Sequence, residues 1–260
     1  MIYIVGFLQI GEFGDLEAEV FEEETYEEIF LIKYDFEGNK IYEKLYGAKR
    51  NDAGRSICIA NEDNIYIVGD TYGGWFIENE TEGTNNFIVK LTSEGNILWG
   101  KEFGSNEQDY AIDVYVDKNG DIYVVGVMNI KETFDTADAF ICKYDKNGNQ
   151  IWMKEIKVDG KEDVISGIKV KEGNVYIVGY SEGNLFSENK GKSDIFIAKY
   201  NTNGEFIWGE MIGIEQGDSG NDIVIDAQGN IYLVGDTEGN LFGANIGGWD
   251  VFIIKFRDKS

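Results

Sequence analysis

Four aspartates recur at the same place in the sequence, each shortly before a short apolar segment, in a pattern that permits metal or acid–base chemistry. They are Asp52, Asp109, Asp163 and Asp218. A ring of carboxylates could hold Ca²⁺, which prefers several oxygen ligands. Alternatively, each aspartate accepts backbone N–H hydrogen bonds in its own turn. Both interpretations stay open at this point, and calcium is the only cofactor that the pattern suggests.

Two tryptophans, Trp75 and Trp249, stand in predicted loops and have no counterparts elsewhere in the chain. An exposed aromatic side chain can stack on a sugar ring or anchor a protein interface. The alternative is that both rings pack the loops in which they lie. The ligand interpretation predicts protein or carbohydrate partners.

Composition excludes several classes of function. The chain of 260 residues has no histidine, so a Ser-His-Asp triad and a His-bearing zinc site are impossible. A net charge of −25 opposes binding to nucleic acid or to an anionic membrane surface. No segment is apolar enough for membrane insertion, and the sequence shows no signal peptide, which leaves a cytoplasmic location open.

The residues that could do chemistry are set in a repeating framework. Five variants of the word I-Y-I-V-G occur at Ile2–Gly6, Ile65–Gly69, Ile122–Gly126, Val175–Gly179 and Ile231–Gly235. Each predicts a strand whose two faces are both covered, because the word is almost continuously apolar. Other apolar words and Asn/Gly turns recur around it and predict three further strands per repeat.

A four-stranded antiparallel unit with two apolar faces must stack against copies of itself, and a β-propeller satisfies that need. The sequence therefore predicts an all-β fold: one propeller domain spanning 1–260, with five repeats of four-stranded blades. The first repeat begins at its second strand and the last stops after its third, so each end blade lacks one strand. The alternative is a segment of a larger propeller or an open repeat array.

Lysine and phenylalanine also recur with the repeat. Each predicted third strand carries one lysine, namely Lys33, Lys90, Lys143, Lys199 and Lys255. Asp138, Asp194 and Asp250 lie five residues before three of them, which suggests a structural ion pair or hydrogen bond. A phenylalanine follows the glycine of each word by seven positions, or by eight in the third repeat, and is interpreted as a loop anchor: Phe13, Phe76, Phe134, Phe186 and Phe242.

The succession Gly229-Asn-Ile-Tyr-Leu-Val-Gly235-Asp-Thr, followed by Gly247-Gly-Trp-Asp250-Val-Phe-Ile-Ile-Lys255, resembles the bacterial and archaeal β-propeller repeat family called SBBP. Repeats of that family look like G-N-V-Y-V-T-G-x-T followed by G-G-x-D-A-F-V-A-K. The resemblance implies a propeller fold and frequent occurrence in exported or cell-surface proteins. It implies no shared activity.

Three functions are compatible with these patterns. The first is a non-enzymatic binding or scaffold module of an exported or cell-surface protein, which contacts proteins or glycans through the loop face that carries Trp75 and Trp249. The second is a carboxylate- or calcium-dependent hydrolase or lyase, since paired carboxylates can serve as acid and base. The third is a purely structural segment of a longer surface repeat array.

Overall fold

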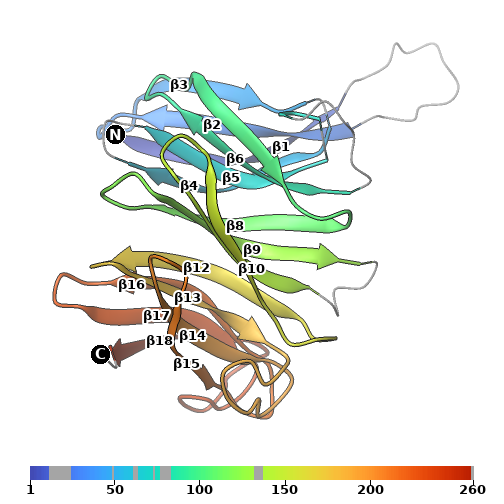
Figure 1. The fold of residues 1–260 in the computed structure, drawn as a ribbon, viewed down its shortest axis with the longest axis vertical. Coiled ribbons are helices and arrows are strands. Elements are labelled where there is room, and N and C mark those ends of the chain that lie inside the picture. Colours follow the sequence, from blue (N-terminus) through green and yellow to red (C-terminus); the bar gives the residue numbers. More distant parts are fainter. Residues whose placement is uncertain are drawn as a thin grey trace, which may run out of the picture. The chain divides into compact units, whose positions relative to one another are not determined.

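The protein is described from a computed structural model, which places residues 1–11, 25–48, 50–60, 64–72, 74–76, 83–131 and 137–258. All regular elements in these ranges are β-strands, and they form five antiparallel sheets of three or four strands (Figure 1). The chain divides into two compact units, Met1–Ala111 and Ile112–Ser260. Each unit is described by itself.

Consecutive strands pair within each sheet. The first sheet holds β1 (Ile2–Gly11), β2 (Thr25–Tyr34) and β3 (Lys40–Tyr46), and the second holds β4 (Asp52–Ile59), β5 (Ile65–Thr71), β6 (Asn85–Leu91) and β7 (Ile97–Phe103). The third holds β8 (Gln108–Val116), β9 (Ile122–Ile130), β10 (Asp138–Tyr144) and β11 (Gln150–Ile156). The fourth holds β12 (Asp163–Lys171), β13 (Asn174–Ser181), β14 (Asp194–Asn201) and β15 (Phe206–Ile212), and the fifth holds β16 (Asp218–Ile225), β17 (Asn230–Thr237) and β18 (Asp250–Arg257).

The order of strands confirms the repeat that the sequence predicts. Three sheets have four strands, and the first and last have three, because the first begins with the I-Y-I-V-G strand and the last ends with the strand after it. The all-β, multi-sheet architecture is therefore established. Closure of five blades into a ring, and their union in one domain, stay predictions.

The I-Y-I-V-G strand contributes apolar side chains to both faces of its sheet. In the fourth sheet, Val175 and Ile177 pack against the third sheet, whereas Tyr176 and Val178 pack against the fifth. We call the face that meets the preceding sheet the backward face and the one that meets the next sheet the forward face. The same division holds between the first and second sheets, where Tyr3 and Val5 contribute to the shared core. Alternation along a strand thus explains why the word is apolar throughout.

The recurring lysines lie over the tyrosines of the words. In all five sheets the lysine pairs in register with that tyrosine, and its Nζ lies 5.1–5.4 Å from the ring centroid. Such cation–π contacts allow an ammonium group to lie between packed sheets. Lys143 and Lys199 are also paired with Asp121 and Asp258, each at 2.7 Å.

The predicted structural ion pair is therefore confirmed for Lys143 and Lys199, but the aspartates five residues earlier are not the partners. Asp194 and Asp250 instead accept backbone N–H bonds from Lys190 and Ile246, at 2.9 and 2.8 Å. Asp138 pairs with Lys157 at 2.9 Å. Successive side chains of a strand alternate faces, so an odd separation of five places each aspartate and its lysine on opposite faces.

The phenylalanine anchors rest on glycines of the fourth strand. Phe186 packs against Phe196 with ring centroids 5.6 Å apart, and a Cβ atom built on Gly209 would lie 2.6 Å from its ring. Phe76 lies against Gly100 in the same way. The anchor prediction is confirmed for these two residues. Phe13 and Phe134 lie outside the described residues.

Candidate ligand-binding site

The four recurring aspartates are fully buried at the beginnings of the first strands of the sheets. One carboxylate oxygen of each accepts a hydrogen bond from a backbone N–H four or five residues earlier. The donors are Ala48 at 2.7 Å for Asp52, Ser105 at 2.5 Å for Asp109, Val158 at 2.6 Å for Asp163, and Ile214 at 2.8 Å for Asp218. These carboxylates therefore order their own turns, as the second interpretation of the pattern states.

Three of these aspartates each lie opposite a serine or threonine at the end of the neighbouring second strand. Asp52 pairs in register with Thr71, Asp163 with Ser181, and Asp218 with Thr237. Burial raises the pKa of each of these aspartates, and the facing hydroxyl opposes that rise. The pKa of Asp163 reaches about 6. Ser181 donates a hydrogen bond to Oδ1 of Asp163, and this buried pair fastens β12 to β13. At the other two sites, Oδ1 of Asp52 and Oδ1 of Asp218 are buried without a hydrogen-bond donor among the described residues.

Among the residues that the structure describes, no three His, Cys, Asp or Glu side chains lie close enough together to hold a metal ion. Each recurring aspartate already receives a backbone donor, as given above. Calcium binding by Asp52, Asp109, Asp163 and Asp218 stays a prediction.

The two tryptophans that interrupt the repeat differ in their surroundings. Trp75, in the first unit, packs against Phe76 and Phe87 with ring centroids 4.2 and 5.2 Å away, and it borders the core between the first two sheets. Trp249, in the second unit, is 53% exposed. Trp75 therefore packs its own loop, whereas about half of the Trp249 surface is exposed to solvent.

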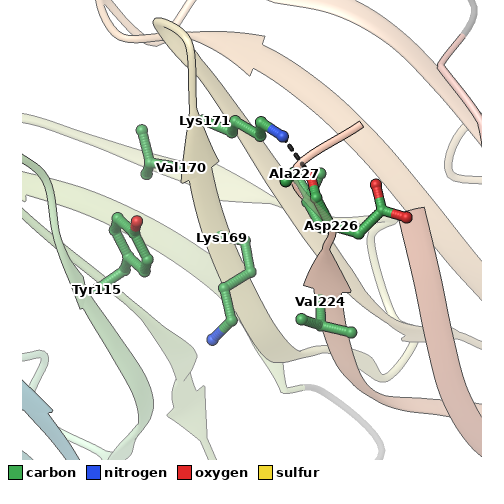
Figure 2. A pocket seen from close by; sticks show the side chains of 8 residues that line it. Tyr115, Lys169, Val170, Lys171, Val224, Asp226 and Ala227 are labelled. Atoms are coloured by element: carbon green, nitrogen blue, oxygen red, sulfur yellow. Dashed lines mark hydrogen bonds between the residues drawn. The ribbon is translucent and has the colours of Figure 1, made fainter. Parts of the chain in front are cut away.

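A cavity of about 190 Å³ lies in the second unit, at the ends of three first strands (Figure 2). Its lining comes from Tyr115 on β8, from 169–171 on β12, and from 224–227 on β16 and the following turn. Lys169 and Lys171 contribute the two positive charges. The Nζ atom of Lys169 lies 5.8 Å from the ring centroid of Tyr115, and that of Lys171 donates to the backbone carbonyl of Asp226.

The one carboxylate in this lining is used by its own turn. Asp226 accepts hydrogen bonds from the backbone of Gln228 at 2.9 Å and from the backbone and side chain of Asn230 at 2.8 and 2.7 Å. The side-chain bond from Asn230 is the main cause that lowers the pKa of Asp226. Among the described residues, no ion pair involves Lys169 or Lys171; the ion-paired lysines include Lys143, Lys157 and Lys199. The two cavity lysines therefore keep their charge available to a ligand.

The cavity residues do not follow the repeat. Tyr115, Lys169 and Val224 occupy the same position of their strands, two residues before the turn, and the second sheet has Cys58 there. Lys171 likewise stands where β8 and β16 are followed by Asp117 and Asp226. A fold that needed these side chains would use similar ones in every repeat. Their variation shows that the shared architecture does not require these particular side chains.

Sequence reasoning missed this cavity. The tryptophans that interrupt the repeat lie in loops, whereas the cavity residues interrupt it within the first strands and the turn that follows. The signal was present, because one strand position reads Cys, Tyr, Lys and Val in successive repeats.

Within the described ranges, no helix is long and apolar enough to cross a membrane. The model of the SBBP family, a beta-propeller repeat, matches residues 207–243. These residues run from the fourth strand of one repeat into the loop after the second strand of the next. The resemblance to this family is thereby confirmed for that part of the chain.

Three other proteins show how far similarity extends. The regulatory protein FlaEY of Caulobacter vibrioides is 23% identical over 107 residues, which are 38% of this chain and 11% of that protein. An ulvan lyase of family PL25, bound to -[GlcA(1-4)Rha3S]-, matches with a TM-score of 0.51 and 12% identity over 98% of this chain and 67% of the lyase. The structure of Drosophila Plexin A in complex with Semaphorin 1b matches with a TM-score of 0.50 and 9% identity, over 88% and 49% of the two chains. These structural similarities concern the fold alone.

Proposed function

We propose that this protein is a non-enzymatic β-propeller module that binds a small anionic ligand in the cavity of Tyr115, Lys169 and Lys171. The five sheets are taken as successive blades of one propeller domain. One observation carries the proposal: two lysines that have no carboxylate partner among the described residues line a cavity at positions that vary between repeats. In a chain of net charge −25, such a cavity is a local site of opposite sign.

The ligand that fits this chemistry carries a carboxylate on a compact polar body, as a uronate sugar does. Each ammonium group can donate charge-assisted hydrogen bonds to a carboxylate, which are stronger than bonds between neutral groups. A carbohydrate partner also agrees with the function proposed from the sequence, although the site differs from the predicted loop face. The ulvan lyase, whose bound fragment contains glucuronate, suggests a suitable probe. The shared fold itself assigns no activity to this chain.

Calorimetric titration with glucuronate oligosaccharides tests the proposal, with neutral glucose oligosaccharides of equal length as the ligand control. We expect Lys169→Met and Lys171→Met each to weaken glucuronate binding by at least about tenfold, which corresponds to about 1.4 kcal/mol. Lys161→Met is the matched control, since Lys161 lies in an exposed turn of the same unit and outside the cavity. Equal affinity of wild type and both cavity variants would overturn the assignment of the site.

The same titration separates binding from catalysis. A binding module returns the oligosaccharide unchanged after long incubation, as judged by chromatography. Cleavage that disappears in Lys169→Met would instead support the hydrolase or lyase alternative and contradict the non-enzymatic function.

A further inference from the structure

Three third strands begin with a residue that lies close to one of the recurring aspartates. These residues are Asn85, Asp138 and Asp194, and their cross-strand neighbours, which directly follow the fourth strands, are Gly104, Lys157 and Gly213. The residue after each neighbour donates its backbone N–H to the recurring aspartate, as described above for Asp109, Asp163 and Asp218. At each place, a side chain from a third strand and a side chain from a first strand therefore meet beside the same short stretch of backbone.

The first two places differ in how their charge is balanced. Asn85 is an uncharged amide beside Asp109. A Cβ atom built on Gly104 would lie 3.2 Å from Oδ1 of Asn85 and would also contact Oδ2 of Asp109, which shows how close the two side chains are. Asp138 is a carboxylate, but Lys157 forms an ion pair with it at 2.9 Å. An amide at one place and an ammonium group at the other thus prevent a second uncompensated carboxylate.

The third place has two carboxylates and no lysine beside them. Asp194 and Asp218 are both fully buried, and Oδ1 of each has no hydrogen-bond partner in the part of the chain that the structure describes. Gly213 stands where Lys157 stands one repeat earlier. Within the described ranges, neither aspartate forms an ion pair, and Lys190, whose charge acts on Asp194, has an exposed side chain. Two buried negative charges at one place require a compensating positive charge.

We propose that a divalent cation binds between the carboxylates of Asp194 and Asp218 and supplies the positive charge that Lys157 supplies one repeat earlier. Ca²⁺ has the required chemistry, because it accepts backbone carbonyls and water as ligands in addition to carboxylates. Two carboxylates balance its charge, and their Oδ1 atoms are the ligands that the protein leaves without a donor. This site differs from a ring of recurring aspartates, since Asp194 belongs to a third strand, and it is separate from the lysine cavity.

Thermal unfolding of chelator-treated protein, with and without calcium chloride, tests the proposal. At a Ca²⁺ concentration about a hundredfold above Kd, we expect the melting temperature to rise by about 5–10 °C. Sodium chloride at equal ionic strength is the control for screening among the many acidic groups and should give a smaller rise. Calorimetric titration with Ca²⁺ measures binding directly, so the test does not depend on stability alone.

Two aspartate variants assign the effect to this place. Asp194→Asn should lose the calcium-dependent rise, and it should fold, because Asn85 occupies the same strand position in the second sheet. Asp138→Asn is the matched control and should keep the rise, since Lys157 already pairs with Asp138.

Three results would overturn the proposal. The first is a wild-type protein that neither binds Ca²⁺ in calorimetry nor gains stability from it, which would mean that the two carboxylates share a proton instead. The second is an equal rise with sodium chloride. The third is an equal calcium-dependent rise in wild type and Asp194→Asn. The calorimetric result on wild type decides the matter even if Asp194→Asn does not fold.

Discussion

The hydroxyl group of Ser105 donates a hydrogen bond to Oδ1 of Asp109 at 3.0 Å. In three other sheets the hydroxyl that faces the recurring aspartate comes from the end of the second strand, at Thr71, Ser181 or Thr237. The third repeat has Met128 at that sequence position, which offers no hydroxyl. Ser105 thus provides, from the preceding turn, the donor that the strand lacks.

Ser105→Ala should destabilise the protein although Ser105 lies in a turn. The substitution removes a donor to a buried carboxylate, and hydrogen bonds to charged groups contribute about 1.5–3 kcal/mol to stability. Urea denaturation followed by tryptophan fluorescence measures the change. Ser181→Ala should cost a similar amount, whereas Ser219→Ala should cost little, since the Ser219 hydroxyl donates to the exposed side chain of Asn221. Equal stabilities of Ser105→Ala and Ser219→Ala would contradict the inference that Ser105 replaces the hydroxyl donor that the second strand lacks.

Asp163 should make stability fall as pH rises through the mildly acidic range. Burial raises its pKa from the ordinary 3.8 to about 6, so between these values the folded protein binds more protons than the unfolded chain. The contribution of protonated Asp163 to the free energy of unfolding is fully present below about pH 4 and is lost as pH rises through about 6. Asp163→Asn should flatten this part of the curve of unfolding free energy against pH.

Asp145→Asn serves as the control for that experiment. The hydrogen bond from the side chain of Asn149 is the main cause that lowers the pKa of Asp145. The contribution of ionised Asp145 to stability is therefore present at neutral pH and is lost on acidification. The two variants should therefore change the pH curve in opposite directions. A change of the same sign in both would show that burial does not govern Asp163.

Gly209→Ala should destabilise the fourth sheet by overpacking. A methyl group at this position would lie 2.6 Å from the Phe186 ring, and an added methylene in a packed region costs about 1–3 kcal/mol. Thermal unfolding of Gly209→Ala, compared with Gly243→Ala, measures the effect, because no atom lies within 4 Å of the corresponding position at Gly243. Phe186→Leu combined with Gly209→Ala should recover part of the loss. No recovery would mean that the ring is not the cause.

The two thiols should differ in reactivity in the native protein. Cys142 is fully buried, and burial raises the pKa of its thiol to about 12, whereas Cys58 is partly exposed. Only the thiolate reacts with disulfide reagents, so we expect Cys58 to react first and Cys142 only after unfolding. Labelling followed by mass spectrometry reports this order. Rapid native labelling of Cys142 would show that the third sheet opens readily.

The sequence predicted the repeat well because the word I-Y-I-V-G is required on both faces of every sheet. It could not identify the partners of Lys143 and Lys199, since Asp121 and Asp258 are brought near them only by hairpin pairing and by packing between sheets. Trp75 illustrates another limit. A tryptophan in a loop is equally compatible with exposure and burial, and its contact with Phe87 depends on how that loop folds back.

The division of the word between two faces has a consequence for how such chains change length. Tyr176 and Val178 pack against the next sheet, while Val175 and Ile177 pack against the previous one. Each sheet therefore carries both of the complementary surfaces that form the interface between neighbouring sheets. Loss of residues 163–217 as a whole would leave the third sheet to meet the fifth through surfaces of the same kind. A gene that gains or loses whole repeats would therefore need no compensating substitutions at the new junction.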